Sequence, residues 1–517
     1  MTPSAHQKIR TRFAPSPTGF VHIGSLRTAL FSFLFARHNQ GVHVLRIEDT
    51  DQSRQVEGAL ENLLKVMKEI GVEFDEGFYL KDDGTVGLPT EASAKVGERG
   101  DFGPYLQSKR LEKYQIAAAK LISENKAYYC FCSQERLDEL KKEQAALKKS
   151  PMYDRLCRNL NADEIKTKLV EFEALGKSPV VRFAIPAEGE TVIHDLIYGD
   201  IVYDHKVLDD QVIIKSDGFP TYHLAVVVDD HEMQITHVIR GEEWLPSTPK
   251  HLLIYQALEW EPTEFAHLPL ILNQDKSKLS KRQGDVSVED FLAKGYLKEA
   301  LINFVAFLGW NPKTEKEIFS LEELIKEFDL AKINKSGAVF DLNKLDWLNG
   351  QYIKKLDVTE LAQRLKAYWQ QAGIDAKKYS DDYLSAIAAL EQERLKKLSE
   401  IGERTKYFFT APEYDPAILV WKKSSAEDAK AKLESLLTVF EGLTDQTSVN
   451  AGELQLILET HIAEIKSDKG SVLWPLRVAL TGLEKSPGPF EVAAILAKGP
   501  GKKEILNRIQ SAISKLG

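Results

Sequence analysis

A histidine and a glycine stand close together near the N-terminus, in the stretch His22-Ile23-Gly24-Ser25 after a proline-rich turn. Apolar residues then recur with the spacing of one buried helix face, at Leu26, Leu30, Phe33 and Leu34. Free backbone N–H groups and the helix dipole favour an anion at a helix N-terminus. Because glycine lets the backbone approach a ligand closely, this stretch suits a nucleotide phosphate. The alternative is a histidine that only caps or packs the helix.

The elements around this stretch form a strand–loop–helix–strand unit. The chain is extended from Arg10 up to the turn, and residues 42–47 have the composition of a second strand. In open α/β sheets, ligands bind at the carboxyl ends of such strands. The Gly-x-Gly-x-x-Gly pattern of dinucleotide enzymes is absent from the loop, so hydride transfer is not favoured.

A basic run lies far downstream, at Lys278-Leu279-Ser280-Lys281-Arg282. A run of this kind alone usually marks a solvated surface. Here it directly follows the apolar residues 268–272, which we expect to be the last strand of the sheet. That strand would deliver the lysines to the same edge as the glycine-containing loop.

Together, the two stretches resemble the HIGH and KMSKS signatures of class I aminoacyl-tRNA synthetases. Four further segments resemble the bacterial type of glutamyl-tRNA synthetase: residues 12–19 (RFAPSPTG), 46–51 (RIEDTD), 103–108 (GPYLQS) and 216–223 (SDGFPTYH). The resemblance runs nearly end to end. It implies a ligase that uses ATP to convert L-glutamate into glutamyl-AMP, and that then transfers glutamate to the 3′ end of tRNA(Glu). Many members of the family need tRNA for the first step.

The resemblance also implies the fold class. We expect an α/β catalytic domain of Rossmann type with a parallel sheet and a mixed α/β insertion, followed by an all-α stem-contact and anticodon-binding region. The expected boundaries are 1–116 and 210–285 for the two catalytic halves, 117–209 for the inserted acceptor-end-binding domain, 286–350 for the stem-contact domain and 351–517 for the anticodon-binding domain.

Several elements are expected from local pattern. Residues 211–215 read as the strand that resumes the catalytic sheet, 191–202 as a hairpin and 291–308 as one helix. Asp357 can cap the helix that follows it. Apolar stripes in the tail indicate a helix bundle, whereas glutaminyl-tRNA synthetases end in β-barrels. A helical tail also argues against a shorter enzyme that glutamylates a modified tRNA base.

By match to the family motifs, seven residues would contact ATP: His22, Gly24, Ser25, Glu243, Lys278, Ser280 and Lys281. Of these, His22, Lys278 and Lys281 would be catalytic, with the two lysines neutralising charge on the leaving pyrophosphate. Loss of His22 or Lys281 would have indicated a catalytically silent paralogue, and both are present. Mg²⁺ is expected to accompany ATP.

Six residues would bind glutamate by the same match: Arg12, Ser16, Glu48, Tyr222, Arg240 and Trp244. Arginine forks suit the two carboxylates, and Glu48 suits the ammonium group. The sequence leaves open which arginine takes the side-chain carboxylate. The family reads the anticodon at the positions of Arg394 and Arg477, and an arginine at the first goes with rejection of tRNA(Gln).

Three cysteines form a C-x-C…C pattern, at Cys130, Cys132 and Cys157. Some family members bind zinc with this spacing and a histidine two places later, where this chain has Asn159. A structural zinc ion needs four N or S ligands, so we expect three reduced thiols and keep an incomplete zinc site as the alternative.

Composition agrees with a soluble globular protein, at 43% hydrophobic and 28% charged residues. No apolar run approaches the roughly 20 residues of a membrane span, and the first residues lack an apolar signal core. Together with three cysteines, this predicts a cytoplasmic protein. The formal net charge of −9 means that phosphate contacts would need a local basic surface. The resemblance implies a monomer.

Overall fold

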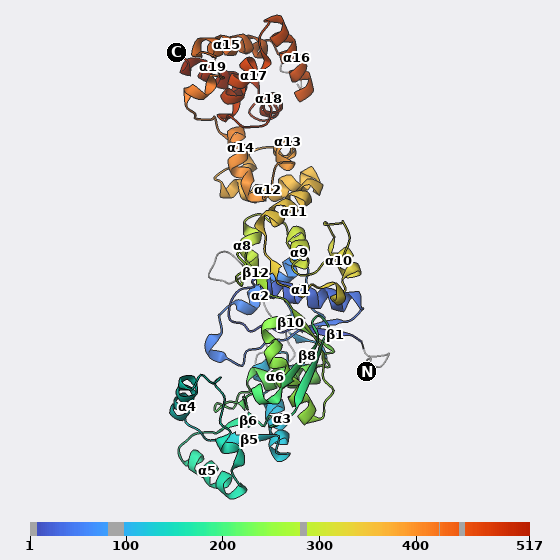
Figure 1. Ribbon diagram of the computed structural model, residues 1–517. Coiled ribbons are helices and arrows are strands. Elements are labelled where there is room, and N and C mark those ends of the chain that lie inside the picture. The colour runs from blue at the N-terminus through green and yellow to red at the C-terminus, as the bar shows by residue number, and fades with distance from the viewer. Residues whose placement is uncertain (1–7, 81–97, 280–286, 423, 444–449) are drawn as a thin grey trace. The chain divides into compact units, whose positions relative to one another are not determined.

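The computed structural model describes most of the chain and divides it into two compact units (Figure 1). Unit 1 contains Met1–Phe291 and Leu301–Leu342, and unit 2 contains Leu292–Ala300 and Asn343–Gly517. The described residues are 8–80, 98–279, 287–422, 424–443 and 450–517. Ser280 and Lys281, which were expected to contact ATP, lie outside them. The division into five domains stays a prediction.

Six strands of unit 1 form the main sheet, in the order β2-β1-β10-β11-β7-β8. The first five are parallel and β8 is antiparallel to β7. Their bounds are β1 Arg10–Phe13, β2 Val42–Leu45, β7 Glu190–Asp195, β8 Gly199–Asp204, β10 His237–Gly241 and β11 Glu264–Leu268. Strand order reverses between β1 and β10, which is where sheets of this kind form a ligand crevice. The predicted parallel-sheet fold is confirmed.

A second, three-stranded antiparallel sheet corrects one expectation. It contains β5 Ala127–Cys130, β6 Val180–Phe183 and β9 Val212–Ile214. Residues 211–215 were expected in the catalytic sheet, but β9 pairs with β6 instead. The hairpin expected at 191–202 is present as β7 and β8, and it extends the main sheet. A short apolar run predicts a strand but not its partner.

Two further expectations were wrong. The last strand of the main sheet is β11, not residues 268–272, because β12 (Ile271–Leu272) pairs with β13 (Ala338–Val339). Residues 291–308 form two helices, α8 (Val288–Ala293) and α9 (Lys298–Ala306). The break lies at Gly295, whose φ is 85° and where a Cβ would meet Ser399 N at 2.6 Å.

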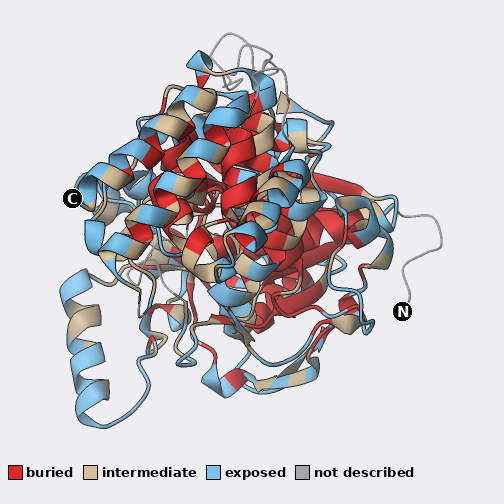
Figure 2. Ribbon diagram, turned by 90° about the horizontal axis from the view of Figure 1, so that it is seen from above, coloured by how far each residue is buried: buried red, intermediate tan, exposed pale blue. Residues whose placement is uncertain are grey.

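The helices of unit 1 pack against the strands of the main sheet. Helix α1 (Ile23–His38) packs on β1, β2 and β10, and its apolar stripe is buried as predicted. Figure 2 shows the buried residues in red in the interior and the exposed residues outside. The remaining helices are α2 Ala59–Ile70, α3 Leu111–Ser123, α4 Gln134–Ala146, α5 Ala162–Ala174, α6 Tyr222–Glu232, α7 Thr248–Leu258 and α10 Leu321–Glu327.

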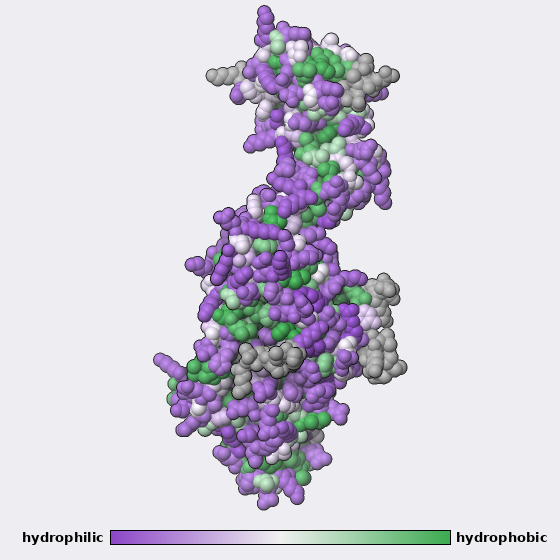
Figure 3. Space-filling view, turned by 90° about the vertical axis from the view of Figure 1, so that its right-hand side faces the viewer, coloured by the Kyte–Doolittle hydropathy of each residue, from purple (hydrophilic) through white to green (hydrophobic). Residues whose placement is uncertain are grey.

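Every described element from residue 342 onward is helical, which agrees with the predicted helix bundle. Asp357 caps α12 by accepting the backbone N–H of Thr359 at 2.8 Å. Figure 3 shows a mainly hydrophilic face with separate hydrophobic patches. Among the described residues, no helix is long and apolar enough to cross a membrane. The helices are α11 Leu342–Lys355, α12 Val358–Gln371, α13 Asp381–Gln392, α14 Ile401–Phe409, α15 Ala426–Gly442, α16 Ala451–Glu464, α17 Lys469–Thr481, α18 Pro489–Lys498 and α19 Lys502–Lys515.

Candidate active site

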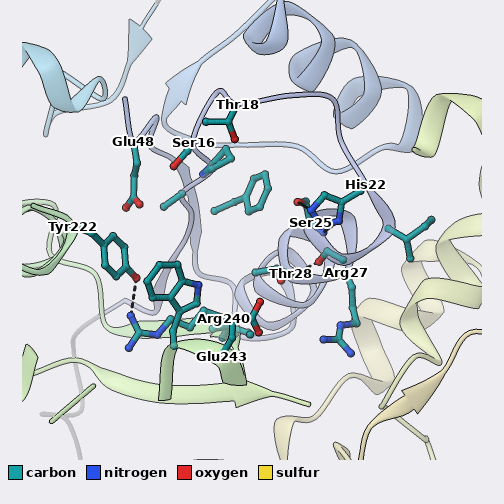
Figure 4. Close-up of a pocket in the computed structure, with 18 of the residues that line it drawn as sticks. Ser16, Thr18, His22, Ser25, Arg27, Thr28, Glu48, Tyr222, Arg240 and Glu243 are labelled. Atoms are coloured by element: carbon teal, nitrogen blue, oxygen red, sulfur yellow. Dashed lines mark hydrogen bonds between the residues drawn. The ribbon is translucent and has the colours of Figure 1, made fainter. Parts of the chain in front are cut away.

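A cavity of about 660 Å³ lies at the carboxyl ends of β1 and β10, beside the N-terminus of α1. It brings together every predicted ATP- and glutamate-binding residue that the structure describes: Arg12, Ser16, His22, Gly24, Ser25, Glu48, Tyr222, Arg240, Glu243, Trp244 and Lys278. These residues come from segments more than 250 positions apart. Figure 4 shows Glu48 and Tyr222 at one end of the cavity and His22 and Ser25 at the other.

Arg12 lies on β1 and is held by one edge of its guanidinium group. Its Nε donates to Asp230 Oδ1 at 3.2 Å, and both side chains are 4% exposed. Burial opposes ionisation of Asp230, but Arg12 and Arg46 outweigh it and lower the pKa of that carboxyl. Because the hydrogen bond uses only Nε, both Nη groups of Arg12 can form a fork toward a carboxylate.

Glu48 follows β2 and is the acid at the same end of the cavity. Arg46 Nη2 donates to Glu48 Oε1 at 3.1 Å, and Arg46 Nη1 donates to Asp230 Oδ1 at 2.6 Å. Burial raises the pKa of the Glu48 carboxyl, although Arg46 and Arg12 oppose the shift. A ligand ammonium group beside Glu48 would favour its ionised form.

Arg240 lies on β10 and contacts a ring of neutral acceptors. Its Nη1 donates to the Tyr222 hydroxyl at 2.9 Å, which Figure 4 marks with a dashed line, and its Nη2 donates to Thr248 Oγ1 at 2.8 Å. Since the Tyr222 oxygen accepts from Arg240, its own proton remains available for a ligand carboxylate. Trp244 covers Tyr222 with ring centroids 4.3 Å apart.

His22 is both the N-cap of α1 and a lining residue of the cavity. Its Nδ1 accepts the backbone N–H of Ser25 at 3.2 Å. His22 can therefore cap α1 and line the cavity at the same time. A Cβ at Gly24 would meet the His22 ring at 3.0 Å, so the glycine leaves room for that ring.

Lys278 reaches the cavity from a tight turn after β12. Leu279 N donates to Ile271 O at 2.9 Å, which closes the turn. Lys278 Nζ lies 3.8 Å from Glu243 Oε1. The 57% exposed lysine side chain and the 47% exposed carboxylate form a weak, solvated pair that a phosphate could replace.

Two polar lining residues on α1 were not predicted, Arg27 and Thr28. Arg27 is buried, and its Nη1 donates to Leu308 O at 3.3 Å. Burial lowers the pKa of Arg27 to about 10, although Glu243 opposes the shift. A signal was present in the sequence, since a cation three positions before the buried Leu30 lies on the apolar side of the helix.

The acidic pair Asp229-Asp230 lies inside α6 and contacts three arginines. Asp229 accepts from Arg110 Nε at 2.6 Å and Asp230 from Arg12 and Arg46. Asp230 thus connects α6 to Arg12 in the lining of the cavity.

The three cysteines form a separate cluster with Tyr153. All three sulfur atoms lie within 4.8 Å of one another, and Cys132 Sγ lies 3.6 Å from Cys157 Sγ. The Tyr153 hydroxyl is 3.3 Å from Cys132 Sγ and 3.5 Å from Cys130 Sγ. A hydrogen bond from Cys157, assisted by Tyr153, lowers the pKa of Cys130 to about 4.

Arg394 and Arg477 belong to unit 2 and not to the cavity. Arg394 follows α13 and is exposed, and its Nη1 lies 4.0 Å from Glu391 Oε1. Arg477 lies on α17 and donates to Ser486 O at 3.0 Å.

Comparison with known proteins gives matches over both units. A family profile described as "tRNA synthetases class I (E and Q), catalytic domain" matches residues 8–347, and another described as "Anticodon binding domain" matches residues 360–513. A glutamate–tRNA ligase of Clostridium botulinum is 45% identical over 515 residues, which are 98% of this chain and 99% of that protein. One from Dehalococcoides mccartyi is 43% identical over 518 residues, 98% of each chain.

Two solved structures resemble this chain over nearly its whole length. A crystal structure of a glutamate tRNA ligase from Elizabethkingia meningosepticum in complex with its amino acid has a TM-score of 0.86 at 35% identity, covering 99% of this chain and 100% of that one. The glutamate–tRNA synthetase of Elizabethkingia anophelis has a TM-score of 0.84 at 35% identity, covering 98% and 100%.

Proposed function

The chain belongs to the glutamate–tRNA ligases of the class I tRNA synthetases, and we propose that the cavity beside α1 is where its glutamate and ATP react. The enzyme is a ligase that forms an aminoacyl-tRNA, and ATP is a substrate of its class. The observation that carries the proposed site is the meeting of Arg12, Glu48 and Arg240 with the N-terminus of α1 in one cavity.

The proposed reaction has two steps. An α-carboxylate oxygen of glutamate attacks the α-phosphorus of ATP, so that an acyl–phosphate bond forms, the Pα–O–Pβ bond breaks and pyrophosphate leaves. A hydroxyl of the terminal ribose of tRNA(Glu) then attacks the carbonyl carbon, and AMP leaves. Neither step needs a protein nucleophile, so positioning and charge stabilisation supply the catalysis.

Glutamate would lie at the Arg12 end of the cavity. The free Nη groups of Arg12 and the hydroxyl of Tyr222 suit its two carboxylates, and Glu48 suits its ammonium group. Ser16 and Trp244 line the same end. Glutamine has a neutral amide in place of the side-chain carboxylate. A buried donor such as Arg12 could then lose its ionised partner, which is costly in a buried site.

ATP would lie at the His22 end of the cavity. The N–H groups at the start of α1 and the small Gly24 suit a phosphate, while Lys278 and Lys281 would neutralise charge on the leaving pyrophosphate. Ser25, Glu243 and Ser280 would complete this end. Mg²⁺ bound with ATP would help to neutralise the phosphate charge, and it needs few protein ligands.

For tRNA, we assign anticodon contacts to Arg394 and Arg477. Guanidinium groups stack on unpaired bases and bond to their edges, and the matched anticodon-binding profile includes both positions. We also propose that the enzyme is a monomer. It would act in the cytoplasm, where tRNA is charged for protein synthesis.

The cysteine cluster fits a structural zinc ion better than the sequence predicted. A tetrahedral site with Zn–S bonds of about 2.3 Å needs sulfur atoms about 3.8 Å apart. The observed 3.6 Å between Cys132 Sγ and Cys157 Sγ is close to that value, and the Tyr153 hydroxyl, 3.3 Å from Cys132 Sγ, can supply a fourth ligand in place of the absent histidine. We therefore assign Cys130, Cys132, Cys157 and Tyr153 as the ligands, with a purely structural role for the ion.

The experiment that tests the function is ATP–pyrophosphate exchange, measured with glutamate and with glutamine, each with and without tRNA(Glu). We expect exchange with glutamate alone of the two amino acids, and only when tRNA is present. Exchange that prefers glutamine contradicts the assigned substrate. Exchange that is equally fast without tRNA contradicts only the tRNA requirement.

A further inference from the structure

Three polar residues form a row across neighbouring strands beneath the glutamate end of the cavity. Asp195 ends β7, His267 lies on β11 and Arg240 lies on β10. His267 and Arg240 are direct partners in the register of β10 and β11, so their side chains share one face of the sheet. All three residues are at most 5% exposed.

The hydrogen bonds of this row determine where its protons lie. Arg240 Nε is 3.1 Å from His267 Nε2, and an arginine N–H can only donate. His267 Nε2 must therefore accept, so the imidazole is neutral and carries its proton on Nδ1. That nitrogen lies 2.6 Å from Asp195 Oδ2, which accepts the proton's hydrogen bond.

Asp195 is fixed by backbone groups on both of its oxygens. Oδ1 accepts the N–H groups of Ile197 and Tyr198 at 2.9 Å each, and Oδ2 accepts the backbone N–H of His267 at 3.1 Å. The side chain is thus an acceptor everywhere, a role that only a carboxylate fills. Burial also lowers the pKa of His267, which agrees with a neutral ring.

We propose that Asp195 and His267 are positioning residues for glutamate binding, because together they hold Arg240 by its Nε and so keep its Nη1 on the Tyr222 hydroxyl, which lines the cavity. If the imidazole took the opposite tautomer, an Nε2–H would face the Nε–H of Arg240, and the guanidinium would turn away. The carboxylate of Asp195 prevents this by demanding the proton on Nδ1. The proposal rests on the assigned role of Arg240 as a glutamate ligand.

The test compares variants that keep or remove the acceptor. His267→Gln places an amide oxygen near the position of Nε2, whereas His267→Leu offers no acceptor. Asp195→Asn keeps the shape but cannot accept on both oxygens. We expect the glutamate KM to rise at least tenfold in His267→Leu and Asp195→Asn, with the ATP KM within twofold of wild type and most of the effect reversed in His267→Gln.

A double-mutant cycle shows whether the effect passes through Arg240. In an Arg240→Ala background, His267→Leu should add less than a twofold further increase in the glutamate KM. Effects that simply multiply overturn the proposal, as does a His267→Leu enzyme with a normal glutamate KM. If Arg240→Ala itself leaves the glutamate KM unchanged, the assigned glutamate site fails rather than the positioning alone.

A measurement on the wild-type protein covers the case in which His267→Leu or Asp195→Asn does not fold. With ¹⁵N-labelled histidine, the His267 ring, assigned by the loss of its signals in His267→Gln, should show the neutral tautomer with the proton on Nδ1 at pH 7. A proton on Nε2, or a doubly protonated ring, overturns the proposal.

Discussion

Arg12 and Asp230 form a buried ion pair that engages only one edge of the guanidinium group. Nε lies 3.2 Å from Asp230 Oδ1, and among the described residues neither Nη group has a hydrogen-bond partner. Asp230 also pairs with a second cation, Arg46, whose Nη1 lies 2.6 Å from Asp230 Oδ1. The carboxylate therefore anchors Arg12 without depending on it, so Arg12 can be replaced while Asp230 stays paired.

This arrangement predicts the effect of Arg12→Ala. Glutamate should lose two charge-assisted hydrogen bonds, each worth about 1.5–3 kcal/mol, so its KM should rise by about 100-fold or more. The ATP KM should change little, because Arg12 lies at the opposite end of the cavity from His22. Steady-state pyrophosphate exchange with each substrate varied in turn checks this, and a larger change in the ATP KM would contradict the assignment.

Lys278 provides a second prediction, with a neighbouring lysine as control. Lys278→Ala should lower the rate of pyrophosphate exchange about 100-fold, since a preorganised donor to transition-state charge is worth about 3 kcal/mol. The exposed Lys276, in the same turn, lines no part of the cavity, so Lys276→Ala should exchange at a normal rate. Lys281→Ala should resemble Lys278→Ala. Equal exchange rates in all three variants would show that Lys278 and Lys281 do not stabilise the leaving pyrophosphate.

The cysteine cluster is tested by metal analysis. Protein washed with a weak chelator should retain about one zinc ion per chain, and Cys157→Ser should retain none, because a structural site needs all of its ligands. Tyr153→Phe removes only the hydroxyl, so it should bind zinc more weakly in a competition with a chromogenic chelator. Wild-type protein that contains no zinc and has three titratable thiols would instead support the expectation, made from the sequence, of three reduced thiols.

Arg394 is tested by charging two tRNAs. The wild-type enzyme should charge tRNA(Glu) and reject tRNA(Gln), whereas Arg394→Gln should accept both, because a neutral side chain loses the guanidinium contact with an unpaired base. The exposed Lys396 is the matched control, and Lys396→Gln should keep the discrimination. A wild-type enzyme that charges both tRNAs equally would disprove this role of Arg394.

A buried histidine away from the cavity makes stability depend on pH. Burial lowers the pKa of His43 to about 3, and Arg37 adds to the effect, whereas an unfolded histidine titrates near 6.5. Between these values the unfolded chain binds a proton that the folded chain does not, so acidification reduces the free energy of unfolding. The contribution of His43 is fully present above pH 6.5 and is lost as the pH falls toward 3.

The variant His43→Gln lacks this linkage. From pH 7 to pH 5, the free energy of unfolding should therefore fall by about 2 kcal/mol more in wild type than in the variant. Urea unfolding at both pH values measures the difference directly, independently of any constant loss of stability in the variant. The same difference at both pH values would show that His43 titrates in the folded protein as it does in the unfolded chain.

The sequence predicted the elements that periodicity alone determines. The apolar stripe from Leu26 to Leu34 predicts α1. The ATP- and glutamate-site residues were expected from the family motifs, and those that the structure describes line one cavity because several of them follow a parallel strand or begin a helix. The carboxyl ends of parallel strands necessarily meet at one edge, so local signals were enough to assemble most of the cavity.

Features that depend on distant partners could not be predicted in this way. The run at Val212–Ile214 is apolar in either sheet, and only its pairing with β6 decides which one it joins. The break at Gly295 depends on the close approach of Ser399, more than 100 residues away. Asp195 and His267 belong to no motif segment, so nothing in the sequence connects them with Arg240.

The direct pairing of Arg240 with His267 makes β11 intolerant of changes in length. Successive side chains of a strand alternate between the two faces of a sheet, so deletion of one residue before His267 would turn the imidazole to the opposite face and set an aliphatic neighbour against the guanidinium. Loops that join the strands elsewhere can lengthen without such a penalty. Insertions and deletions in relatives with the same activity should therefore avoid residues 264–268, however much the surrounding loops differ.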